Sequence, residues 1–334
     1  MTESSSRLRI IEETPAYWRV VFDNPPLNIM DADMFEGLQD LLGRMDTSPS
    51  LRVVVFESAN PDFYLAHFEV KDTARTLTLL QTVGPSGLPS LLDTFVRLTK
   101  SPVVSIAKIR GRARGVSSEF LLACDMRFAS RENTALAQVE VGSGVHPGGG
   151  ATERLPPLVG RGRALEIVLG SNDFDGETAE RYGYVNRALP DKELDGFVDA
   201  LARRIASFDR RPIAAAKKLI NDVSLPTAES LLDGLTSFTT ALTWPEAQQR
   251  FQALFKRGWN QPGDMENRYS ELLGTLMDDK LRSGIQIQTE ECDESRGDRC
   301  ANASHHHRHR RHRNLLQGLG GRPADRLQPR LAIE

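Results

Sequence analysis

Cysteine is scarce in this chain, with three residues among 334. Cys124 lies in an apolar segment, whereas Cys292 and Cys300 lie in a polar stretch near the end. This distribution excludes the disulfide framework of a small secreted protein. The first residues also lack the basic and then apolar layout of a signal peptide. Together these absences predict a cytoplasmic protein.

Long apolar runs and a strong net charge are missing as well. No uninterrupted apolar segment reaches the roughly 18 residues that a membrane-spanning helix needs. The formal net charge is −3, which provides no general electrostatic attraction for nucleic acid. We therefore expect neither a membrane nor a nucleic acid as partner. The content of 40% hydrophobic and 26% charged residues is typical of a globular protein.

What the sequence does contain is an alternation of strand and helix patterns in its first part. A helix is expected to begin at Asp31, a good N-cap residue, and to bury the apolar residues that recur at helical spacing from Met34 to Met45. The turn from Gly111 to Gly115 precedes a second helix. Strands alternating with helices predict an α/β core. The expected strands lie at 8–11, 17–22, 53–56, 102–107, 125–128 and 135–137. The uninterrupted apolar run at 53–56 predicts a strand that is buried on both faces.

From about residue 160 the pattern becomes helical, with helices expected at 228–242 and 246–257 among others, and it changes again near residue 284. We predict an α/β core with the active site at 1–200, a helical region at 201–284, and a disordered tail at 285–334. The tail contains the segment from His305 to His312, which is rich in histidine and arginine. Such a segment is consistent with metal or RNA binding, but a solvated extension without a role is the simpler explanation.

Two glutamates in the middle of the chain each lie beside a glycine-rich turn. Glu119 follows Gly111 and Gly115, and Glu140 precedes the run Gly148–Gly150. Two carboxylates that converge on one pocket can hold a water molecule, with one accepting a proton from it and the other giving a proton to carbon. Turns rich in glycine allow backbone N–H groups to point at a developing oxyanion. The pattern predicts addition of water to an activated carbonyl compound.

These stretches resemble the crotonase superfamily, which includes enoyl-CoA hydratases. The resemblance covers roughly residues 8–222, and it implies a crotonase-like (ββα) spiral core with a C-terminal helical trimerisation region. It also implies a homotrimer or a hexamer made of two trimers. The matching segments are Gly111-Arg-Ala-Arg-Gly115, Glu119 to Asp125, Gln138-Val-Glu140, Pro147 to Gly150, Arg154 to Gly160 and Ala179 to Asn186.

The resemblance further implies an acyl-CoA thioester substrate, with coenzyme A carried by the substrate and with neither a separate cofactor nor a metal. Two backbone N–H groups, at Ala66 and Val116, would hold the thioester oxygen, and the N–H of Gly148 would help to hold the water. Glu140 would exchange a proton with the α-carbon, and Glu119 would activate the water. The expected reaction converts 2-trans-enoyl-CoA into 3-hydroxyacyl-CoA.

Two residues depart from the common pattern of the superfamily. Val116 stands where glycine is frequent, and β-branched residues disfavour a positive φ. His67 replaces a glycine beside Ala66, and with Gly115 it is a candidate for lining the pocket. Two alternatives therefore stay open. One is an enoyl-CoA double-bond isomerase, which can work with one glutamate, and the other is a catalytically weak homologue that binds acyl-CoA.

Overall fold

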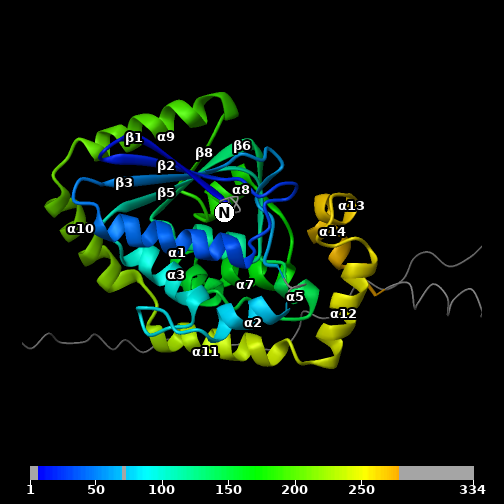
Figure 1. The fold of residues 1–334 in the computed structure, drawn as a ribbon. Helices are drawn as coiled ribbons and strands as arrows, with labels where there is room; N and C mark the ends of the chain where they lie inside the picture. The colour runs from blue at the N-terminus through cyan, green and yellow to red at the C-terminus, as the bar shows by residue number, and fades with distance from the viewer. Residues whose placement is uncertain (1–6, 70–72, 278–334) are drawn as a thin grey trace, which may run out of the picture. The chain divides into compact units, whose positions relative to one another are not determined.

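A computed structural model describes residues 7–69 and 73–277, which lie in one compact unit spanning Met1–Arg282. Its strands form an eight-stranded sheet in the order β1-β2-β3-β5-β6-β7, with β4 paired to β5 and β8 paired to β6 (Figure 1). The strands are β1 (Leu8–Thr14), β2 (Tyr17–Phe22), β3 (Val53–Ser58), β4 (Phe63–Leu65), β5 (Val104–Arg114), β6 (Met126–Ala137), β7 (Phe174–Asp175) and β8 (Arg187–Leu189).

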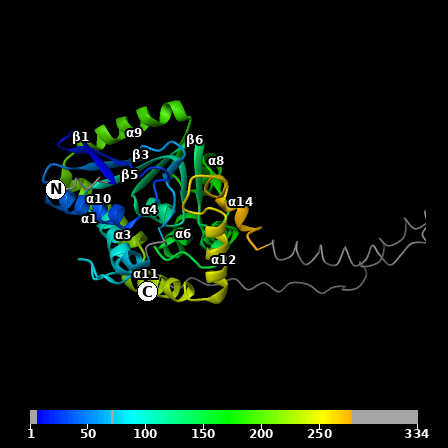
Figure 2. The same cartoon turned by 45° about the vertical axis from the view of Figure 1, so that its right-hand side comes forward.

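Helices cover both faces of this sheet. One face carries α9, and the other carries α1, α3 and α4 (Figures 1 and 2). The α/β fold class predicted from the sequence is confirmed. The helices of the described residues are α1 (Ala32–Thr47), α2 (Thr73–Gln81), α3 (Ser90–Lys100), α4 (Val116–Ala123), α5 (Glu140–Ser143), α6 (Ala151–Val159), α7 (Arg161–Gly170), α8 (Gly176–Tyr182), α9 (Asp191–Ala206), α10 (Arg210–Ser224), α11 (Ala228–Ala241), α12 (Pro245–Lys256), α13 (Asp264–Asn267) and α14 (Tyr269–Leu273).

The packing of strand β3 on both of its faces explains why its residues are apolar without interruption. Val53 and Val55 pack into the cluster beneath α9, whereas Val54 and Phe56 pack into the larger cluster on the opposite face. Because β3 pairs in parallel with β2 and β5, it lies inside the sheet and both of its faces are buried. The prediction of a doubly buried strand is confirmed.

The start of α1 also agrees with the sequence. The side chain of Asp31 accepts a hydrogen bond from the N–H of Met34 at 2.9 Å, which satisfies one of the free donors at the helix start. The apolar residues of the predicted face, from Met34 to Met45, are buried.

Strands β5 and β6 are longer than predicted. The stretch from Gly111 to Gly115 is not a separate turn, because β5 continues through Gly111 to Arg114 and pairs with the second half of β6. Gly111 has a φ of 77°, and a Cβ there would lie 2.6 Å from the carbonyl carbon of Asp62. This glycine therefore bends β5 where the chain of Asp62 passes close by, and the strand does not end. The residues 125–128 and 135–137 likewise belong to one strand, β6.

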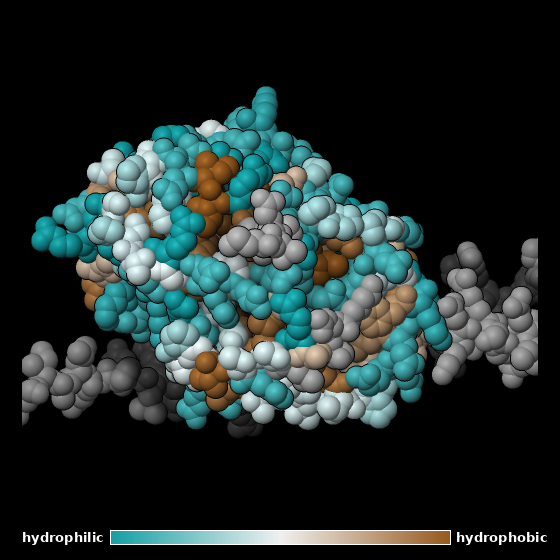
Figure 3. Space-filling view, in the orientation of Figure 1, coloured by the Kyte–Doolittle hydropathy of each residue, from teal (hydrophilic) through white to brown (hydrophobic). Residues whose placement is uncertain are grey.

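The last helices of the described chain return to the part of the core that contains α5 and α6. Helix α11 contacts α6, and both α12 and α14 contact α5 (Figures 1 and 2). The helices predicted at 228–242 and 246–257 are confirmed as α11 and α12. The face in Figure 3 is mainly hydrophilic, and its hydrophobic residues form separate small groups.

The predicted tail at 285–334 lies outside the described residues. Within the described ranges, no helix has both the length and the apolar character that crossing a bilayer requires.

Candidate active site

Glu119 lies in the first turn of α4, where strand β5 passes into the helix. Its side chain is buried, with 2% exposure. Its Oε1 accepts hydrogen bonds from the backbone N–H groups of Gly149, at 2.8 Å, and Ala151, at 3.1 Å. A Cβ on Gly149 would lie 2.4 Å from the other carboxylate oxygen of Glu119. The glycine-rich turn thus holds this carboxylate at a fixed position.

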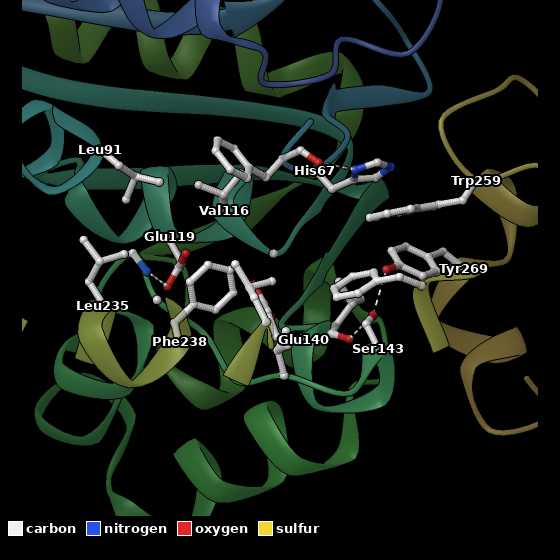
Figure 4. A pocket seen from close by; sticks show the side chains of 18 residues that line it. His67, Leu91, Val116, Glu119, Glu140, Ser143, Leu235, Phe238, Trp259 and Tyr269 are labelled. Atoms are coloured by element: carbon white, nitrogen blue, oxygen red, sulfur yellow. Dashed lines mark hydrogen bonds between the residues drawn. The ribbon is translucent and has the colours of Figure 1, made fainter. Parts of the chain in front are cut away.

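Glu140 is the first residue of the short helix α5, which follows β6. Its Oε2 is buried and has no hydrogen-bond partner among the described residues. Gly115 lies against the carboxylate, because a Cβ at this position would be 3.0 Å from Oε1 of Glu140. The structure therefore brings Glu140 next to the β5–α4 junction that carries Glu119, and both glutamates line one cavity (Figure 4).

Burial controls the charge of both carboxylates. It raises the pKa of Glu119 above the ordinary value of 4.5, although the N–H groups of Ala151 and Gly149 and the charge of Arg154 oppose this shift. Burial also raises the pKa of Glu140 well above 4.5, and here the negative charge of Glu119 adds to the effect. The stronger opposing contacts at Glu119 favour an ionised Glu119 beside a protonated Glu140.

Val116 is the first residue of α4 and lies in the cavity wall. Its N–H belongs to the first turn of the helix, where backbone donors have no acceptor inside the helix. The residue with a positive φ at this junction is Gly115, at 60°, and not Val116. The β-branched side chain is therefore compatible with the backbone, and it is buried in the core.

The predicted donor at Ala66 has a different partner. Its N–H donates to the carbonyl of Asn28 at 3.0 Å, and Ala66 is not among the residues that line the cavity. Two residues on, Phe68 lines the cavity, and no described residue accepts a hydrogen bond from its N–H. Phe68 forms an isolated parallel bridge with Met30. The N–H of Met30 donates to the carbonyl of His67, and the carbonyl of Met30 accepts from the N–H of Glu69. The N–H of Phe68 therefore points away from Met30.

His67 lies in the cavity wall, as the sequence suggested, and it joins the site to α13. Its Nε2 lies 3.0 Å and 3.1 Å from the two carboxylate oxygens of Glu266, and its Nδ1 lies 3.1 Å from the carbonyl oxygen of Phe68. The ring stacks on Trp259 with centroids 4.7 Å apart. Burial alone would raise the pKa of Glu266, but its contacts with His67 and Asn260 hold it below the ordinary value.

Arg114, which precedes Gly115, has a structural role in the same region. It forms an ion pair with Asp173, with Nη2 to Oδ2 at 2.6 Å, and it donates to the carbonyl of Glu266 at 2.6 Å. The side chain is 1% exposed. Arg114 thus connects the end of β5 to α13.

Apolar side chains from the C-terminal helices cover the cavity. Phe238 of α11 packs on Gly148, where a Cβ would lie 2.5 Å from its ring. Gly148 lies in the lining as predicted, although nothing in the sequence alone linked it to Phe238. The spacing of apolar residues along α11 was the available signal for this cover. The covering residues are Leu235, Phe238, Leu242, Phe251, Trp259 and Tyr269 (Figure 4).

Comparison with known proteins agrees with this architecture. The sequence model described as enoyl-CoA hydratase/isomerase matches residues 14–249. The chain belongs to the enoyl-CoA hydratase/isomerase family. This assignment confirms the resemblance to the crotonase superfamily that the sequence motifs indicated.

Several members of the enoyl-CoA hydratase/isomerase family illustrate the similarity. A crystal structure from Streptomyces avermitilis, provisionally named an enoyl-CoA hydratase, is 42% identical, with a TM-score of 0.77 over 82% of this chain and 98% of that chain. The short-chain-enoyl-CoA hydratase of Clostridium acetobutylicum is 27% identical over 64% of this chain and 80% of its own length. The crotonyl-CoA hydratase of Syntrophomonas wolfei is 26% identical over 64% and 81%, respectively.

Proposed function

We propose that this protein adds water to 2-trans-enoyl-CoA thioesters and forms 3-hydroxyacyl-CoA. The observation that carries the proposal is the pair of carboxylates in one largely apolar cavity, that of the buried Glu119 and that of Glu140, whose Oε2 is buried and unpartnered. The names of the hydratases among its relatives support the same chemistry.

The two carboxylates suit different roles in this reaction. Glu119, fixed by two backbone N–H groups, would accept a proton from the water as its oxygen bonds to the β-carbon. Glu140, whose pKa burial and Glu119 raise further, would hold the proton that is given to the α-carbon. The two groups return to their starting charges when the proton passes from Glu119 back to Glu140 through solvent or bound water.

The backbone supplies the stabilisation of the thioester oxygen. As water adds, negative charge develops on this oxygen, and two N–H donors aimed at it lower the barrier. We assign these donors to Val116 and Phe68, in place of Ala66, because the N–H of Ala66 bonds to Asn28. Loss of one such donor in other enzymes costs about 3 kcal/mol of transition-state stabilisation.

The test is the absorbance of the conjugated thioester of crotonyl-CoA, followed with wild type and with two variants. We expect wild type to remove the band, and Glu140→Gln and Glu119→Gln each to slow its loss by roughly 10²- to 10⁴-fold, since each removes one proton-transfer group. Glu271→Gln, at an exposed position on α14, is the matched control and should retain full activity.

The same experiment separates the alternatives. An enzyme that is only an isomerase would leave the crotonyl-CoA band unchanged, whereas wild type and Glu119→Gln would both shift the double bond of a 3-enoyl-CoA. A binding protein without activity would hold the thioester and leave the band unchanged at every acyl length. Either result would reject the proposed hydration.

A further inference from the structure

A second cavity, of about 490 Å³, lies between α10 and the core. It shares no lining residue with the candidate active site. Apolar side chains from four parts of the chain, Leu122, Leu158, Ile220 and Leu225, form much of its wall. The volume is sufficient for a small organic molecule.

Arg154 of α6 reaches this cavity with an unpaired charge. The residue is 7% exposed, and its Nε is buried without a partner. Among the residues that the structure describes, none accepts a hydrogen bond from its guanidinium, and no carboxylate forms an ion pair with it. Glu119 and Glu153 influence it only through their more distant charges. A buried Nε without an acceptor, on a charge without a carboxylate partner, is costly, which indicates that an acceptor from outside the described chain belongs here.

The other charges around the cavity leave a positive excess. Lys217 and Asp125 compensate each other through a contact of 2.7 Å. Arg127, which is 6% exposed, donates to the carbonyls of Tyr184 and Cys124 and so keeps its charge without a carboxylate. Burial and the charge of Arg127 lower the pKa of Arg154 to about 10. A negatively charged ligand would offset this excess.

The geometry points to a specific kind of anion. A guanidinium matches the planar, two-oxygen shape of a carboxylate. The apolar wall beside it suits a hydrocarbon group, whereas a small inorganic anion would leave that wall wet. We propose that the cavity binds an amphipathic monocarboxylate of medium chain length, with its carboxylate on Arg154 and its hydrocarbon tail along Leu158 and Leu225.

Calorimetric titration of the full-length protein with octanoate tests this proposal. We expect saturable binding with one octanoate per chain. Acetate lacks the tail and octanol lacks the charge, so each should bind at least tenfold more weakly. Equal binding of octanol would overturn the assignment to Arg154, and the absence of saturable octanoate binding would overturn the site itself.

Three variants locate the binding. Arg154→Met removes the charge, and we expect it to weaken octanoate binding at least tenfold. Ala216→Phe adds bulk at an exposed position of α10 that lines the cavity, and it should have a similar effect while leaving Arg154 intact. Phe238→Trp reduces the active-site cavity and should leave octanoate binding unchanged.

The pattern across the variants decides the outcome. If Arg154→Met fails to fold, Ala216→Phe still provides the answer, because its side chain enters the cavity from the surface. Binding that persists in Ala216→Phe but is lost in Phe238→Trp would place octanoate in the active site and reject the proposal. None of these measurements depends on hydratase activity.

Discussion

At the scale of single residues, the unpartnered carboxylate oxygen of Glu140 should make the stability of the protein depend on pH. Burial raises the pKa of Glu140 well above its unfolded value of about 4.5, so the folded state binds the proton more strongly than the unfolded state does. The contribution of Glu140 to the free energy of unfolding is therefore complete below pH 4.5, and it is lost as the pH rises towards the pKa of Glu140 in the folded state.

Glu140→Gln removes this titration and keeps the shape of the side chain. We expect the variant to gain stability relative to wild type by about 1.4 kcal/mol for every pH unit between 4.5 and the folded pKa. Urea denaturation of both proteins at a series of pH values measures the difference. A difference that stays constant or shrinks as the pH rises would contradict the buried position of this carboxylate.

Gly149 leaves room for the carboxylate of Glu119, so a larger residue at this position should lower the hydration rate. Alanine at this position places a Cβ 2.4 Å from the Oε2 of Glu119, so the carboxylate must move. Because small displacements of a catalytic group are costly, hydration by Gly149→Ala should fall on the order of 10²-fold. Gly162→Ala, where a Cβ meets nothing within 4 Å, is the matched control and should be as active as wild type.

At the scale of helices and strands, the local sequence pattern predicted those features that depend on interactions between residues close in sequence. The N-cap at Asp31, the buried face of α1 and the doubly buried strand β3 depend on residues close in sequence, and all three are confirmed. The continuation of β5 through Gly111 depends on pairing with β6 and on the close approach of the backbone of Asp62. Both are contacts between residues far apart in sequence, which a local pattern does not reveal. The pairing of His67 with Glu266 spans 199 residues and was equally invisible.

That pairing joins the loop after β4 to α13 and should stabilise the cover of the active site. Glu266→Gln removes the charge that faces His67 and weakens the acceptor for the N–H of Asn260. A hydrogen bond to a buried charged group contributes about 1.5–3 kcal/mol, and we expect a loss of this order, which urea denaturation can measure. The exposed pair of Arg268 and Glu271 offers the control, since Glu271→Gln should leave the midpoint unchanged. Equal midpoints for both variants would show that the His67 contact does not stabilise the fold.

At the scale of the whole molecule, the sequence motifs located both glutamates, because their glycine neighbours are characteristic of the family. The motif around His67 lacks a glycine, and the N–H of Ala66, the donor expected from the sequence, bonds to Asn28, so we propose Phe68, two residues on, as the donor instead. The aromatic cover from α11, α12 and α14 required the packing of remote helices. The motifs thus identified two glutamates that line one cavity, while the shape of that cavity depended on tertiary structure.

The outer face of α10 bears on how copies of this chain associate. Leu219 and Val223 are 68% and 87% exposed, and they lie about one turn apart. Contiguous exposed apolar residues of this kind mark contact surfaces. We predict that the protein forms a homotrimer or a hexamer, as the resemblance implied, and that this face of α10 takes part.

Light scattering after size-exclusion chromatography measures this assembly directly. We expect a mass of three or six times the 37.1 kDa chain for wild type. The double variant Leu219→Glu and Val223→Glu should shift the mass towards one chain, because burying two carboxylates in an apolar contact is unfavourable. Val83→Glu changes a residue of similar exposure, at 64%, on another part of the surface and should leave the mass unchanged. A single-chain mass for wild type would reject the assembly, and an unchanged mass in the double variant would place its interface away from α10.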